Sequence, residues 1–148
     1  MNIFNKEENL KLQTRLQDLT SGTTPIWGKM TASQVVLHCQ KPLDVADGKL
    51  ILKRSLVGFL FGKMAKNSFL KNDEFKRNLP TAPEFRVVST PDFEKEKRVL
   101  LSLVDKFGTM GAQVLVNKKH PFFGTMTNEE WGILLFKHLD HHLNQFGV

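Results

Sequence analysis

Two stretches of the chain carry the same helix-starting pattern. Residues 28–34 read GKMTASQ and residues 124–130 read GTMTNEE, so both follow G-x-M-T-x-x-[Q/E]. In such a capping box the threonine hydroxyl accepts a hydrogen bond from a first-turn amide, and the Gln or Glu side chain reaches back to the threonine amide. The pattern predicts helices that begin after Thr31 and Thr127. It also fixes which side chains share a face along each helix.

The spacing of apolar residues predicts two more helices. Residues 5–20 place leucines roughly on one side, with acidic residues in the first turn. A further helix is expected after Thr90 as the N-cap, with Pro91 at the first helical position and Gly108 as the stop. With the two capped helices, which run to about residue 46 and nearly to the C-terminus, the chain has four predicted helices.

The long connection between the second and third helices also constrains the fold. A loop this long in a compact domain usually has structure or function of its own, and residues 55–64 have the composition of a short apolar helix. Only residues 85–88 and 113–116 are candidates for short extended segments. We therefore expect a single all-α domain over residues 1–148, a four-helix bundle with a long crossover between helices two and three.

Composition excludes several classes of protein. The chain has 148 residues, of which 41% are hydrophobic and 24% charged, as in ordinary globular domains. No apolar stretch approaches the ~20 residues of a membrane span, and the polar, acidic N-terminus does not resemble a secretory signal. Cys39 is the only cysteine, so an internal disulfide cannot form. We expect a cytoplasmic protein without a membrane span.

The net charge of +6 is concentrated in the crossover. Between residues 49 and 77 eight basic residues stand against two acidic ones, and 8 − 2 = +6, so the remainder is neutral. These basic residues are Lys49, Lys53, Arg54, Lys63, Lys66, Lys71, Lys76 and Arg77. They form either a solvated face or a site for an anionic ligand. No nucleic-acid-binding motif accompanies them, so nucleic acid is not the expected partner.

Three of the five histidines lie within five positions near the C-terminus. On a helix capped by Thr127, His138 and His142 are four residues apart and share one face. His141 is displaced from His142 by about 100°. This face also carries the predicted core residues, whereas the outward positions are Lys137, Asp140 and Asn144. A solvated histidine tail would not show this pattern.

His38 supplies the third imidazole. It lies about 10 Å from the start of its helix, and His138 and His142 lie about 6–13 Å from the end of theirs, at about 1.5 Å per residue. If the two helices run antiparallel with aligned ends, the three side chains meet at one level. Three histidines with open coordination positions are typical of catalytic zinc sites. The alternative is that they are ordinary core histidines.

Two residues near these histidines have simpler interpretations. Cys39 points about 100° away from its neighbour His38, so it is expected to pack in the core. His120 precedes the fourth helix and is expected in a loop, from which it could reach the mouth of a pocket.

The fourth helix is apolar on a second side as well. Ile133, Phe136 and Leu143 lie opposite the histidines. A helix with two apolar sides must be covered twice. Either the crossover covers the second side or another subunit does, and we expect a homodimer.

The motifs around the histidines resemble those of the DinB-like superfamily. They read W-G-x-M-T-x-x-Q-x-x-x-H, then H-P-F-F-G-x-M-T-x-x-E-W, then H-L-D-H-H-L-x-Q-F-G, and they occupy residues 27–38, 120–131 and 138–147. The match extends over both histidine-bearing helices and their entries. The resemblance is strongest to a branch of small bacterial proteins of unassigned function. The crossover and the third helix match only by order and length.

The resemblance implies a four-helix bundle that holds a divalent metal through one histidine of helix two and an H-x-x-x-H pair of helix four. Carried over to this chain, those ligands are His38, His138 and His142. The metal could be zinc, nickel, iron or manganese. Characterised relatives include thiol-dependent transferases and isomerases that use bacillithiol, mycothiol or glutathione. No substrate-binding motif matches in this chain.

These observations lead to two hypotheses about function. The first is a metal-dependent enzyme, either a thiol S-transferase or a hydrolase, acting on a small molecule. In this hypothesis the carboxylates of the thiol contact Lys53, Arg54 and Lys63, and the cavity is lined by Phe59, Phe61, Phe122 and Phe123. The second is a non-catalytic protein, related to stress or binding, whose metal stabilises the bundle. A structural site of this kind usually has a fourth protein ligand, which His120, His141 or an acidic residue could supply.

Overall fold

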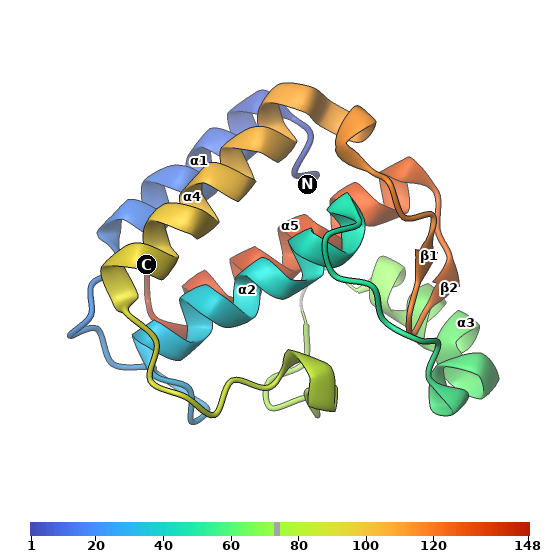
Figure 1. Ribbon diagram of the computed structural model, residues 1–148, viewed down its shortest axis with the longest axis horizontal. Helices are drawn as coiled ribbons and strands as arrows, with labels where there is room; N and C mark the ends of the chain where they lie inside the picture. Colours follow the sequence, from blue (N-terminus) through green and yellow to red (C-terminus); the bar gives the residue numbers. More distant parts are fainter. Residues whose placement is uncertain (73–74) are drawn as a thin grey trace.

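The computed structural model describes residues 1–72 and 75–148, and this part of the chain is mostly helical (Figure 1). Its α-helices are α1 (Lys6–Asp18), α2 (Ala32–Asp47), α3 (Leu56–Lys71), α4 (Phe93–Met110) and α5 (Asn128–Gln145). The shorter elements are the 3₁₀ turns η1 (Pro83–Phe85) and η2 (Gly111–Val114) and the two-residue strands β1 (Lys119–His120) and β2 (Gly124–Thr125).

Four of the helices contact one another in a ring. Helix α4 packs against α1 and α2, and α5 packs against the same two helices. Helices α2 and α5 run antiparallel, as do α1 and α4 (Figure 1). The all-α prediction is confirmed for the described residues. That this arrangement is a DinB-like four-helix bundle with a crossover stays a prediction.

Both predicted capping boxes are present. The Thr31 hydroxyl accepts from the Gln34 amide at 3.3 Å, and the Thr31 amide donates to Gln34 Oε1 at 3.0 Å. At α5 the same pair of bonds joins Thr127 and Glu130 at 2.8 and 3.1 Å. The register of the two histidine-bearing helices is therefore the one that the sequence predicts.

The predicted ends of α4 are wrong at both termini. The N-cap is Asp92, whose carboxylate accepts from the Lys95 amide, and not Thr90. The helix continues through Gly108, where an added Cβ would lie 2.6 Å from the Asn9 side chain. Gly108 is therefore required for close packing of α4 on α1 and does not stop the helix.

The crossover contains more regular structure than the sequence indicated. Helix α3 has 16 residues and extends beyond the apolar segment 55–64. The predicted extended segments 85–88 and 113–116 contain parts of the two 3₁₀ turns instead. The strand pair is joined by a turn at residues 121–123, and Gly124, the first residue of β2, has a φ of +78°. No helix among the described residues combines the length and apolarity needed to cross a membrane.

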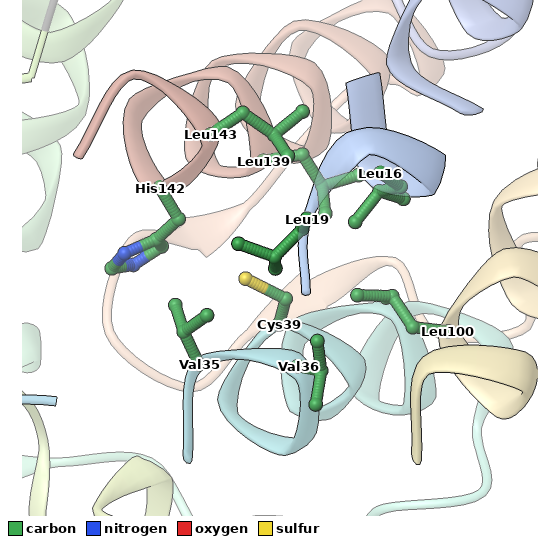
Figure 2. Close-up of a pocket in the computed structure, with 9 residues that line it drawn as sticks. All are labelled: Leu16, Leu19, Val35, Val36, Cys39, Leu100, Leu139, His142 and Leu143. Carbon is green, nitrogen blue, oxygen red and sulfur yellow. The ribbon is translucent and has the colours of Figure 1, made fainter. Parts of the chain in front are cut away.

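Cys39 lies inside the helical ring, as predicted. It borders a cavity of about 10 Å³ together with leucines and valines of the surrounding helices, and His142 lies at the edge of this cavity (Figure 2). Burial raises the pKa of the Cys39 thiol, so the sulfur stays protonated at neutral pH. The protonated thiol acts as a small apolar side chain.

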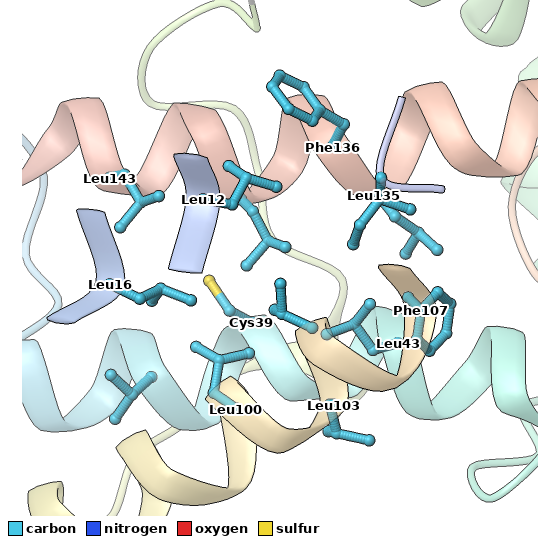
Figure 3. Close-up of a cluster of buried hydrophobic side chains, with 14 of the residues drawn as sticks. Leu12, Leu16, Cys39, Leu43, Leu100, Leu103, Phe107, Leu135, Phe136 and Leu143 are labelled. Atoms are coloured by element: carbon cyan, nitrogen blue, oxygen red, sulfur yellow. The ribbon is translucent and has the colours of Figure 1, made fainter. Parts of the chain in front are cut away.

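The core lies between α1, α2, α4 and α5 (Figure 3). Its largest fully buried side chains include Trp131, Phe107, Leu12, Leu43, Leu100 and Leu135. Each helix of the ring contributes to this set, so burial of apolar area by the ring fixes the relative positions of α2 and α5.

The second side of α5 is covered within the single chain. Phe136 and Leu143 are 6% and 3% exposed. Lys137, predicted to point outward, is buried, because its Nζ donates to the carbonyl oxygens of Phe69 and Asn72 in the crossover. Phe136 and Leu143 therefore need no second subunit, and the homodimer stays a prediction without this support.

Two glycines hold α3 against the β1–β2 turn. A Cβ added at Gly58 would lie 2.6 Å from the carbonyl oxygen of Phe122, and one at Gly62 would overlap the same atom. Lys66, on the same side of α3, forms an ion pair with Glu130 at 2.9 Å. The inner face of α3 is therefore set by close contact between backbones.

We predict that Gly62→Ala displaces α3. The methyl group would overlap backbone atoms that cannot rotate away, and overpacking of this kind costs about 1–3 kcal/mol. Amide hydrogen exchange over residues 56–71 should accelerate by roughly tenfold or more. The matched control is Gly22→Ala, where the nearest atom to the new Cβ is 4.0 Å away. Unchanged exchange in Gly62→Ala would contradict the close packing.

Candidate metal centre

Three histidines from two helices converge at one point. His38 comes from α2, and His138 and His142 come from α5. Their ring centroids lie 4.7 to 4.9 Å apart, and their potential ligand atoms all lie within 4.8 Å of one another. The antiparallel pairing of α2 and α5 thus brings together the residues that the sequence singled out.

The orientation of His38 is set by the crossover. Its Nδ1 lies 3.0 Å from the carbonyl oxygen of Phe85, which can only accept. Nδ1 therefore carries the proton, and Nε2 keeps its lone pair. Lys41, one turn further along α2, donates to the carbonyl oxygens of Glu84 and Arg86 on either side of Phe85 and holds this acceptor in place.

The orientation of His142 is set by Gln145. The Gln145 amide nitrogen donates to the Trp27 carbonyl oxygen at 2.7 Å, so the amide oxygen must face the other way. That oxygen lies 2.8 Å from His142 Nδ1 and accepts its proton. The His142 Nε2 lone pair is left free. Metal-binding histidines usually have a partner of this kind on the other ring nitrogen.

The three imidazoles are neutral at pH 7. Burial lowers the pKa of His142 to about 3. Burial, together with His142 and His38, holds the pKa of His138 well below its ordinary value. Burial also lowers the pKa of His38, although its hydrogen bond to Phe85 acts in the opposite direction. Neutral imidazole is the form that binds a metal ion.

The donor geometry fits a divalent cation. With metal–nitrogen bonds of about 2.0–2.1 Å, two nitrogens at a tetrahedral angle lie about 3.3 Å apart. His38 Nε2 and His138 Nε2 are 3.0 Å apart. Small rotations of the rings would bring all three donors to bonding distance. Among residues 1–72 and 75–148 no fourth ligand joins this group.

A groove of about 520 Å³ lies next to the three histidines, although none of them lines it. Phe75 and His141 are in its wall, and their rings lie 6.2 Å from the His138 ring and 5.2 Å from the His142 ring. Its remaining lining residues are Ile26, Trp27, Arg77, Lys137, Asp140, Asn144, Gly147 and Val148. The groove therefore combines aromatic rings with cationic side chains.

The predicted lining of this cavity is wrong. Phe59 and Phe61 are exposed on α3, and neither Phe122 nor Phe123 borders the groove. The aromatic walls are Trp27 and Phe75.

The predicted cations are also placed elsewhere. Lys53, Arg54 and Lys63 do not line the groove. Arg54 lies over the Phe59 ring at 5.1 Å. Of the eight basic crossover residues, Arg77 reaches the groove, where its guanidinium lies 4.1 Å from the Trp27 ring. The path of the crossover determines which of its basic side chains reach the groove. The local sequence pattern does not predict that path.

Residues 7–147 match the model of a protein family described as a protein of unknown function, DUF1569. The chain belongs to this family. No curated protein and no solved structure matches the chain. The match includes the three histidines and helices α1 to α5 of this DUF1569 chain, apart from Lys6 at the start of α1.

His120 has a structural role in this DUF1569 chain. It lies in β1 and not in a loop, is buried, and its Nδ1 accepts from the amides of Phe122 and Phe123. Its ring packs against Trp131 at 5.3 Å. His120 shapes the hairpin turn and does not belong to the group of three histidines.

His141 lies beside the three histidines without joining them. Its ring contacts those of Trp27 and Phe75 at 5.8 and 5.6 Å. Because His141 is displaced from His142 by about 100° around α5, its side chain lines the groove.

We predict that His38→Ala, His138→Ala and His142→Ala each weaken zinc binding by more than roughly a hundredfold, beyond the usual effect of losing a second-shell partner. His141→Ala, the matched control on the same helix, should keep most of the affinity. Zinc titration of tag-free protein measures both. If His141→Ala abolishes binding and His142→Ala does not, the ligand assignment is wrong.

We also predict that metal-free protein loses stability below about pH 6.5. Burial lowers the pKa of His120 to about 4 and that of His142 to about 3, whereas both lie near 6.5 in the unfolded chain. The unfolded state then binds more protons, so the free energy of unfolding falls as the pH falls. His120 alone should account for about 2 kcal/mol between about pH 7.5 and pH 5.

His120→Asn tests this contribution, because it keeps a hydrogen-bond acceptor and removes the titrating group. Urea unfolding of chelator-treated protein across this pH range should show a smaller slope for the variant than for the native chain. Equal slopes would show that His120 does not titrate as a buried neutral group.

Proposed function

We propose that this chain is a divalent-metal-dependent enzyme with a DinB-like four-helix bundle, and that it transfers a low-molecular-weight thiol to an electrophile. The observation that carries the proposal is the convergence of His38, His138 and His142 beside an open groove. Two of these imidazoles have their Nδ1 protons committed to protein acceptors. A hydrolase that uses the same centre is the second form of the proposal.

The donor set supports catalysis more than a purely structural role. Three neutral imidazoles do not cancel the charge of a divalent ion, and no fourth ligand joins them among the described residues. When bound, such an ion would lower the pKa of a thiol or water that reaches it, so that thiolate or hydroxide forms near neutral pH. No side chain is then required as a general base.

The groove suits an anionic thiol. Arg77 offers a guanidinium at its wall, and Trp27 and Phe75 offer aromatic surface for an apolar electrophile. A guanidinium pairs with carboxylate through two parallel hydrogen bonds. Arg77 therefore takes the role that the sequence had suggested for Lys53, Arg54 and Lys63.

The reaction with chlorodinitrobenzene illustrates the chemistry. The thiol sulfur forms a bond to the aromatic carbon, and chloride leaves with the bonding electron pair. The thiol proton passes to solvent or buffer. The products are a thioether and hydrogen chloride, and no oxidant or reductant is needed.

We predict slow thiol conjugation that depends on a metal. Protein purified without a nickel column would be assayed with chlorodinitrobenzene or a bimane and a panel of thiols that includes bacillithiol, mycothiol and glutathione. Activity should disappear on chelation and in His138→Ala. Arg77→Gln should raise the KM for the anionic thiol by roughly tenfold, the loss of one charge-assisted hydrogen bond, with a smaller effect on kcat. Lys63→Gln, the matched control outside the groove, should change KM little.

The same preparation separates this proposal from its rival. In the non-catalytic alternative, coordination spectroscopy would find a fourth protein ligand, and the metal would raise the unfolding temperature without any turnover. A closed site together with silence across thiol and ester panels would exclude both enzyme forms. An open site with ester cleavage and no conjugation would favour the hydrolase.

A further inference from the structure

The exposed apolar side chains of this protein gather in one place. Among the described residues, 15 large hydrophobic side chains are exposed, and seven of these lie between residues 51 and 64. They are Ile51, Leu56, Val57, Phe59, Leu60, Phe61 and Met64. Large contiguous apolar surfaces are uncommon on monomers and usually mark a binding site. We name these seven residues the α3 patch.

The packing of α3 explains why this patch faces outward. Gly58 and Gly62 form the inner face against the hairpin turn, and Lys66 is tied to Glu130. At 100° per residue, Leu60 and Met64 then fall on the opposite side, and they are 71% and 68% exposed. Leu60 and Met64 face outward because the backbone contacts at Gly58 and Gly62 leave no space for a larger side chain between α3 and the hairpin turn.

Positive charge lies at both ends of the α3 patch and within it. Lys53 and Arg54 precede the helix, Lys63 lies within it, and Lys71 ends it. All four are exposed. No acidic residue occurs in the sequence from residue 49 to residue 72. An apolar face bordered by exposed cations is typical of helices that lie in the interface of an anionic membrane.

We propose that the α3 patch binds the surface of an anionic phospholipid membrane. Helix α3 would lie in the plane of the interface, with Leu56, Leu60 and Met64 among the acyl chains and the lysines at the lipid phosphates. A second copy of this chain is a poorer fit, because pairing two such faces would bring two uncompensated sets of cations together. The proposal does not depend on the metal centre.

Vesicle co-sedimentation with the full-length protein tests this binding. Native protein should sediment with vesicles that contain phosphatidylglycerol in phosphatidylcholine, much less with phosphatidylcholine alone, and less as salt is raised. Leu60→Gln/Met64→Gln should weaken partitioning by roughly tenfold or more, through lost apolar burial. Lys63→Gln/Lys71→Gln should weaken binding to anionic vesicles by roughly tenfold, with little change on neutral ones.

The controls distinguish binding through the α3 patch from nonspecific hydrophobic adsorption and from misfolding of the variant. Leu10 on α1 is 62% exposed and lies outside the patch, so Leu10→Gln should bind as the native protein does. An unchanged far-ultraviolet circular dichroism spectrum and thermal unfolding midpoint in Leu60→Gln/Met64→Gln would show that the variant is folded.

Two results would overturn the proposal. One is that anionic vesicles do not sediment the native protein at physiological salt. The other is that light scattering finds a dimer which Leu60→Gln/Met64→Gln dissociates while vesicles remain unbound, since the patch would then be a protein interface.

Discussion

The antiparallel contact between α2 and α5 is the constraint on which the candidate site depends. His38 lies in the first half of α2, and His138 and His142 lie in the last half of α5. Only opposite helix directions place these positions at the same level. The capping boxes fix where each helix begins, and the shared core with α1 and α4 holds the two helices together. The hydrogen bonds of the capping boxes and the burial of apolar side chains thus together determine where the three histidines lie.

Placing the histidines together is not sufficient for metal binding, because each ring has two nitrogens. Backbone and amide acceptors decide which nitrogen keeps its lone pair. The carbonyl of Phe85 takes the proton of His38, and Gln145 takes that of His142. Lys41 and the Trp27 carbonyl then hold these two acceptors in place. Segments far apart in the chain therefore orient the donor nitrogens, and a change in the crossover would alter the orientation of His38 at the metal centre.

The sequence predicted those parts of the fold that depend on local interactions. The helix starts at Thr31 and Thr127 were right because a capping box involves residues three positions apart. The proximity of the histidines followed from the helical period and one assumption about direction. The misplaced N-cap of α4, which is Asp92 and not Thr90, is a local error, whereas two other errors involve distant contacts. Gly108 lies within α4 because it packs against the Asn9 side chain of α1, and Lys137 is buried because the crossover covers it.

The crossover links helix α3 to the wall of the groove through contacts between aromatic rings. The inner side of α3 holds Phe69, whose ring lies 4.5 Å from that of Phe75. Phe75 in turn contacts the rings of His138 and His141. This chain of rings leads from the helix that carries the exposed apolar patch to the wall of the groove. Phe75 lies outside the helices and contacts Phe69, so we expect the packing of α3 on its glycines to influence the shape of the groove beside the metal centre.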